Sequence, residues 1–111
     1  MRTLAMDELG YLEQRFGKQS EVARFLGVKR PAVTRWKKGK DKPSEENEER
    51  IVALRLVTLK LSAIFEDEMV FEWLMGTNPL LNNNRPIDLI MNGRSTEVLG
   101  AIEQTRAGSF A

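Results

Sequence analysis

Glycine and proline residues divide the chain into short segments, and this punctuation constrains the fold more than any other feature of the sequence. Gly17, Gly27, Gly39 and Pro43 interrupt the first third of the chain. Apolar residues between them recur at helical spacing, and strand-like alternation is absent. With 111 residues, 41% of them hydrophobic, the chain has room for one compact domain or two small modules that support each other. The sequence therefore predicts an all-α protein.

A long central helix is predicted after Pro43. Ser44 is a suitable N-cap, and Glu45 and Glu46 complement the positive end of the helix dipole. We expect this helix to run to about Glu66. The sequence then predicts a helix over residues 69–74, a stop and turn over residues 76–79, a helix from Pro86 to Gly93, and a helix that is capped by Ser95 or Thr96 and ends before Gly108.

Missing residue types exclude several classes of function. The chain has no cysteine and no histidine, so it lacks disulfides, Cys/His zinc sites and Ser-His or Cys-His catalytic pairs. It also lacks a Gly-rich phosphate-binding loop. Acidic residues from Glu66 to Glu72 are expected to form a solvated surface at helix ends. We predict a non-enzyme without metal or cofactor.

No apolar run is long enough to span a membrane, so we expect a cytoplasmic protein with no membrane partner.

The charges are segregated along the chain. Residues 1–43 carry 11 basic and 5 acidic side chains, whereas residues 44–72 carry 3 basic and 8 acidic ones. Residues 18–42 alone hold nine basic residues against Glu21 and Asp41. A basic block of this kind suits a polyanionic partner, and its alternative role is a solvated surface that aids solubility.

The window from Gln19 to Lys38 has the spacing of a helix-turn-helix. Ala23 is small enough for two helices to cross closely, and Gly27 can adopt the positive φ of the tight turn. The interface between the helices is expected to contain Val22, Leu26, Val28, Val33 and Trp36. We therefore predict that residues 1–43 form a DNA-binding module with operator DNA as its partner.

The second helix of that unit is predicted to be the recognition helix. Arg35 is the expected guanine reader, because its planar fork can bond O6 and N7 together. Lys37 and Lys38 are expected to contact phosphates, as is Gln19 at the start of the preceding helix. The complete predicted DNA-binding set is Gln19, Lys29, Arg30, Pro31, Thr34, Arg35, Lys37 and Lys38.

The central segment, residues 44–68, is predicted to serve packing and dimerisation, because its apolar residues form two stripes. One stripe contains Ile51, Leu54, Val57, Leu61, Ile64 and Phe65; the other contains Val52, Leu56, Leu59 and Ala63. A helix that is apolar on two sides must be covered on both. The second stripe is covered either by the chain's own modules or by a second copy, and a homodimer is favoured because helix-turn-helix proteins usually bind two half-sites.

The last third of the chain carries a distinctive series of residues: Trp73, Leu74, Asn78, Leu80, residues 85–90 (Arg-Pro-Ile-Asp-Leu-Ile), Gly93, Val98, Leu99, Ile102 and residues 108–110 (Gly-Ser-Phe). In these residues it resembles the C-terminal toxin-binding domain of Xre/MbcA/ParS antitoxins. Preceded by a helix-turn-helix, that domain is typical of Xre-type antitoxins encoded beside RES-domain toxins. The resemblance implies that residues 69–111 form a toxin-binding domain, and that the protein neutralises a NAD-degrading RES-domain toxin and represses its own promoter.

The same resemblance indicates which residues meet the toxin. Arg85, Pro86 and Asp88 match the motif that joins two helices, and Gly108 with Phe110 matches the tail. The toxin-binding set that it implies is Arg85, Arg106, Gly108, Ser109 and Phe110. Where many members have glycine before the Arg-Pro pair, this chain has asparagine at positions 82–84, and asparagine tolerates the left-handed conformation next best.

Each of these assignments has an alternative. Arg85 and Asp88 can form a local surface pair, and Phe110 can fold back onto its own core. The alternative for the whole chain is a stand-alone, phage-type transcriptional repressor without a toxin partner. The presence of a RES-type reading frame next to the gene would distinguish the two functions.

Overall fold

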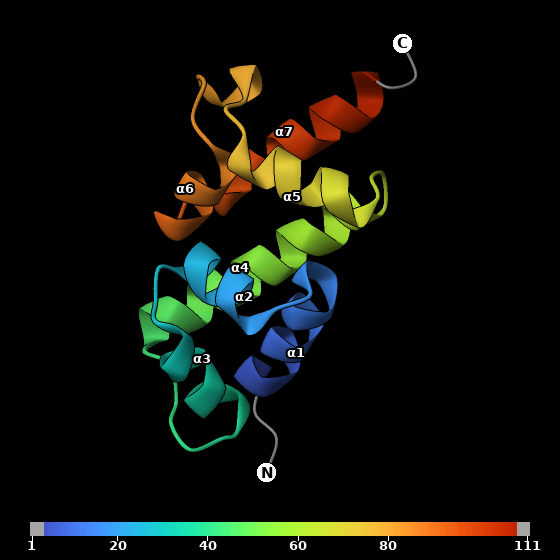
Figure 1. Ribbon diagram of the computed structural model, residues 1–111. Helices are drawn as coiled ribbons and strands as arrows, with labels where there is room; N and C mark the ends of the chain where they lie inside the picture. Colours follow the sequence, from blue (N-terminus) through green and yellow to red (C-terminus); the bar gives the residue numbers. More distant parts are fainter. Residues whose placement is uncertain (1–3, 109–111) are drawn as a thin grey trace. The chain divides into compact units, whose positions relative to one another are not determined.

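The computed structural model describes residues 4–108, and these form helices and connecting turns without a β-strand (Figure 1). The elements are α1 (Leu4–Phe16), α2 (Gln19–Leu26), α3 (Arg30–Lys37), α4 (Glu45–Ser62), α5 (Asp67–Met75), the 3-10 helix η1 (Pro79–Leu81), α6 (Pro86–Met91) and α7 (Ser95–Gly108). The predicted all-α class is confirmed. The chain divides into two compact units, one up to Arg55 and one from Leu56 onward.

In the first unit, α1, α2 and α3 pack against one another in pairs (Figure 1). Leu9 and Leu12 of α1 are fully buried, and the Phe16 ring lies 4.6 Å from that of Phe25 on α2. Of the five predicted interface residues, Val22, Leu26, Val33 and Trp36 are buried, as is the small Ala23. The fifth, Val28, is only half-buried, because it lies in the turn between the two helices. Each buried leucine or valine stabilises the fold by about 1.5–3 kcal/mol relative to an exposed one, so this small core holds α3 firmly in place.

The turn between α2 and α3 depends on Gly27, which has a φ of 67°. This left-handed conformation lets the Val28 N–H donate to the Ala23 carbonyl at 3.0 Å, which satisfies a terminal carbonyl of α2. Pro31 occupies the first turn of α3, where its missing N–H leaves no helical hydrogen bond unmade. The two predicted helices and the glycine turn between them lie at the expected positions.

The central helix α4 begins as predicted and ends earlier. The Ser44 hydroxyl accepts a hydrogen bond from the Asn47 N–H at 3.1 Å, which confirms Ser44 as the cap. The predicted end near Glu66 is wrong, because α4 stops at Ser62. After Ser62 the chain forms a closing turn, in which the Leu61 carbonyl accepts from the Ile64 N–H at 3.0 Å and from the Phe65 N–H at 2.8 Å. Glu66 instead precedes α5 as its extended N-cap residue.

The two apolar stripes of α4 have different environments. Ile51, Leu54, Val57 and Leu61 are fully buried. In contrast, Val52, Leu56 and Leu59 are 38%, 38% and 40% exposed. Ala63, predicted to continue this second stripe, is exposed and lies outside the helix. The second stripe therefore consists of Val52, Leu56 and Leu59, and we call it the exposed stripe.

In the second unit, α6 packs against α5 and α7, and η1 packs against α7. The core of this unit contains Val70, Leu74, Leu81, Ile87, Ile90, Val98 and Ile102. Pro86 is the first residue of α6, as predicted. Two boundaries of α7 differ from the prediction: it starts at Ser95 rather than after a Ser95 or Thr96 cap, and it includes Gly108. Helix ends commonly shift by one or two residues, because the first and last turns lack part of their hydrogen bonds.

The loop before α6 is built around Asn78, which is buried. Its side chain accepts from the Leu80 N–H at 2.9 Å, and its N–H donates to the Asn84 carbonyl at 3.1 Å. Asn82 and Asn83 have φ values of 55° and 63°. The expectation that asparagine supports the left-handed turn in place of glycine is confirmed.

Candidate functional site

The outer surface of α3 is the basic face of the first unit. Lys29, Arg30, Arg35 and Lys38 are exposed there, as is Pro31. The opposite side of the helix contains Val33 and Trp36, both buried against the core. Helical periodicity thus places the predicted side chains toward solvent, where a phosphate backbone or a base edge can reach them.

Gln19 and Thr34 join the two helices at the border of this face. The Thr34 hydroxyl donates a hydrogen bond to the Gln19 amide oxygen at 2.9 Å. Thr34 is therefore half-buried between α2 and α3 rather than fully outward. Because Gln19 is the first residue of α2, this bond links the start of α2 to the middle of α3. The bond adds a polar contact between α2 and α3 to the apolar packing that holds the basic helix.

Arg35 has an acidic neighbour from the loop that follows α3. The Arg35 Nε lies 3.7 Å from an Asp41 carboxylate oxygen, and both side chains are about half exposed. The sequence predicts Arg35 as a base reader and does not indicate this pair. The only available signal was that Asp41 is one of two acidic residues in the basic block.

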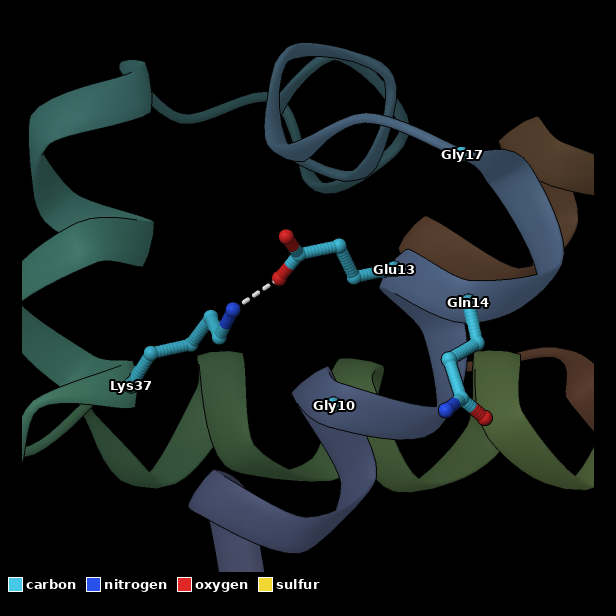
Figure 2. Close-up of a pocket in the computed structure, with 5 residues that line it drawn as sticks. All are labelled: Gly10, Glu13, Gln14, Gly17 and Lys37. Carbon is cyan, nitrogen blue, oxygen red and sulfur yellow. Dashed lines mark hydrogen bonds and ion pairs between the residues drawn. The ribbon is translucent and has the colours of Figure 1, made fainter.

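Lys37 differs from the other predicted DNA-binding residues, because its ammonium group pairs with the Glu13 carboxylate of α1 (Figure 2). The pair lies beside a surface hollow of about 460 Å³, lined by Gly10, Glu13, Gln14, Gly17 and Lys37. Each of the two side chains is only about 30% exposed. Lys37 therefore ties α3 to α1 in this structure, a contact that no local sequence pattern indicates.

In the second unit, Arg85 and Asp88 form a local pair at the start of α6. The Arg85 Nε and Nη2 each donate to an Asp88 oxygen at 2.9 Å. This hydrogen bonding by Arg85 lowers the pKa of Asp88 and raises the pKa of Arg85. The local-pair alternative for these residues thus describes their arrangement in the free chain.

The remaining predicted toxin-binding residues lie at the end of α7. The Arg106 Nη2 donates to a Glu103 oxygen at 2.8 Å, and both side chains are exposed. Gly108 is the last residue of the helix. Ser109 and Phe110 lie outside the described residues. Arg106 is therefore exposed to solvent near the end of α7.

Residues 4–108 contain neither a metal-binding group of acidic side chains nor a membrane-spanning helix. No group of three or more acidic side chains that could hold a metal ion is found within these residues. None of the helices in the same range is long and apolar enough to cross a membrane.

By fold and by site, the chain is a small all-α protein that carries its candidate functional side chains on exposed helix surfaces. No family model matches it. It is 26% identical over 110 residues to the mycobacterial cidal antitoxin MbcA of Mycobacterium tuberculosis and Mycobacterium bovis, a match covering 99% of this chain and 97% of the relative. It is 34% identical over 92 residues to a probable mycobacterial cidal antitoxin of Mycobacterium tuberculosis, covering 83% of this chain and 78% of that relative.

A solved structure supports the same fold. The chain matches a chain of the crystal structure of the Mycobacterium tuberculosis MbcT-MbcA toxin-antitoxin complex with a TM-score of 0.80, at 24% identity, over 99% of this chain and 100% of that one. Its sequence relatives show that the chain belongs to the family of mycobacterial cidal antitoxins. Antitoxins have a non-enzymatic role, so the prediction of a non-enzyme is confirmed by these relatives.

Proposed function

We propose that this antitoxin neutralises a RES-domain, NAD-degrading toxin in the cytoplasm and binds operator DNA to repress its own promoter. Family membership supports the antitoxin role, and the relative MbcA has been crystallised in complex with the toxin MbcT. The RES identity of the toxin rests on the resemblance of residues 73–111 to the Xre-type domain. Because its relatives are antitoxins, the stand-alone repressor is not the function we favour.

The exposed basic surface of α3 is the observation that carries the DNA-binding part of the proposal. Lys29 and Arg30 stand at its N-terminal end, the end of a recognition helix that reaches base edges in the major groove. Nine basic residues between positions 18 and 42 attract the phosphate backbone before any base is contacted. The Gln19–Thr34 hydrogen bond supports the proposal, since it links the basic helix to α2.

The exposed stripe supports a homodimer. Val52, Leu56 and Leu59 lie on the side of α4 opposite its buried residues and keep 38–40% exposure in the single chain. A second copy that covers this stripe would remove apolar surface from water and place two DNA-binding modules on one assembly. Two-fold symmetric modules bind palindromic half-sites spaced about one turn of DNA apart.

Toxin capture is assigned to the second unit. Arg106 is exposed on the last turn of α7, and it can exchange its partner Glu103 for an acidic group of the toxin at little cost, because exposed pairs contribute about 1 kcal/mol or less. Phe110 is proposed to supply apolar burial in the toxin cleft. Two nitrogens of the Arg85 guanidinium group are already bonded to Asp88, so we place its contact second to that of the tail.

Two substitutions on α3 test the DNA-binding proposal. Arg35→Ala should weaken binding to the preferred duplex by about 1–3 kcal/mol and relax specificity at one base pair, because it removes a bidentate base contact. Lys38→Ala should instead weaken binding to all sequences alike and reduce the salt dependence, because it removes a phosphate contact. Gel-shift titrations at two salt concentrations measure both effects. An Arg35→Ala variant with wild-type affinity and selectivity would show that α3 does not read DNA.

A further inference from the structure

The loop after α3 folds back onto the helix and brings Asp41 to Arg35. The Lys40 N–H donates to the Arg35 carbonyl at 3.0 Å, and Gly39, with a φ of 71°, makes the reversal possible. The Asp41 Oδ1 accepts a hydrogen bond from the Lys42 N–H at 2.9 Å. This bond fixes one carboxylate oxygen within the loop, and the other oxygen, Oδ2, faces Arg35 at 3.7 Å.

The position of the carboxylate selects one edge of the guanidinium group. An arginine can pair with a guanine through its Nε and one Nη, or end-on through its two Nη atoms. Asp41 lies at the Nε atom of Arg35. The edge that stays available for a base is therefore the end-on edge, formed by the two terminal nitrogens.

We propose that Asp41 is a positioning residue that orients Arg35 for end-on recognition of a guanine and disfavours binding to other sequences. The inference rests on the proposed DNA binding. As an ion pair between two half-exposed groups, the contact adds little to the stability of the fold. The effect of the ion pair is on specificity. The pair restricts the Arg35 side chain before DNA binds, and the negative charge of Asp41 opposes an orientation of Arg35 that pairs with a phosphate instead of a base.

Asp41→Asn tests the inference, because it removes the charge and keeps the shape. Glu45→Gln is the matched control: it changes the net charge equally, and Glu45 is an exposed residue in the first turn of α4. One probe is a duplex library with a randomised core, which reports base preference. The other is a mixed-sequence duplex of fixed length, which reports non-specific affinity.

We expect Asp41→Asn to lose about threefold or more of the guanine preference at one base pair and to bind the mixed-sequence duplex more tightly than wild type. Glu45→Gln should change the affinity for both probes by the same factor. In an Arg35→Ala background, Asp41→Asn should leave base preference unchanged, because its effect passes through Arg35. Circular dichroism confirms that each variant is folded.

Three results would overturn the inference. If wild type selects a sequence and Asp41→Asn selects it equally well, Asp41 does not orient Arg35. If Asp41→Asn changes base preference equally in the Arg35→Ala background, it acts through another residue. If wild type binds neither probe, the proposed DNA binding fails and the inference fails with it. The first two results leave DNA binding intact and so separate the two claims.

Discussion

Gly27 and Gly10 show how the same residue type has opposite roles at two positions of the first unit. Gly27 ends α2 with a left-handed φ of 67°, which costs other L-residues about 1–2 kcal/mol. Gly10 lies within α1, and a Cβ atom added there would meet no heavy atom within 4 Å. The backbone therefore requires a glycine at position 27 and does not require one at position 10.

From this difference we predict opposite changes in stability. Gly27→Ala should lower the free energy of unfolding by about 1–2 kcal/mol, whereas Gly10→Ala should raise it by about 0.5–1 kcal/mol, because alanine loses less entropy in a helix. Urea denaturation followed by circular dichroism measures both. A Gly27→Ala variant as stable as wild type would mean that the turn between α2 and α3 is not held in the left-handed conformation.

At the scale of elements, sequence signals predicted the helices that begin or end at a glycine, proline or capping residue. Ser44, Gly27 and Pro86 each mark a boundary that the structure places as expected. The end of α4 was missed, because no glycine or proline lies between Ser62 and Asp67. There the helix ends in a tight turn that local residue preferences do not encode.

The candidate site was also predictable only in part. Periodicity was sufficient to place Arg35 and Lys38 on the outer side of α3. The pairing of Lys37 with Glu13 depends on how α1 packs against α3, across 24 positions of sequence, and no helical pattern contains that information. The Arg85–Asp88 pair, in contrast, joins residues only three positions apart, and the local pair considered from the sequence describes it.

The start of α6 leads to a prediction about pH. Arg85 holds the pKa of Asp88 below its ordinary value, so the pair stabilises the fold above the ordinary carboxyl pKa of about 4 and loses this effect as pH falls through the lowered value. Asp88→Asn should therefore be less stable than wild type at pH 7, and the difference should shrink below about pH 4.

Unfolding free energies measured from pH 7 to pH 2 test this prediction. Glu97→Gln should behave in the same way, since Arg94 lowers the pKa of Glu97 through a similar two-bond pair at the start of α7. A constant stability difference between Asp88→Asn and wild type across this pH range would show that the pair does not contribute as described.

For the whole molecule, the exposed stripe of α4 leads to a prediction about assembly. If Leu56 and Leu59 are covered by a second copy, the double substitution Leu56→Glu/Leu59→Glu should give a folded monomer with weakened binding to DNA, because carboxylates would be buried without partners. Leu80→Glu is the control, since Leu80 is also an exposed leucine but lies on η1. Light scattering gives the mass of each variant.

Equal masses for the double variant and wild type would contradict a dimer through this stripe. Loss of helicity in the double variant at an unchanged mass would show that these leucines contribute to the chain's own core. Either outcome would leave the DNA-binding and toxin-binding proposals to stand on their own residues.

The central claim is that the chain is an antitoxin whose C-terminal residues block a NAD-degrading toxin. The most direct test measures NAD consumption by the protein encoded next to this gene, with equimolar full-length chain, with a Phe110→Ala variant, and with a variant lacking residues 106–111. We predict that the full-length chain suppresses NAD loss, that Phe110→Ala suppresses it less, and that the shortened variant does not suppress it. Undiminished NAD loss with the full-length chain would contradict the account.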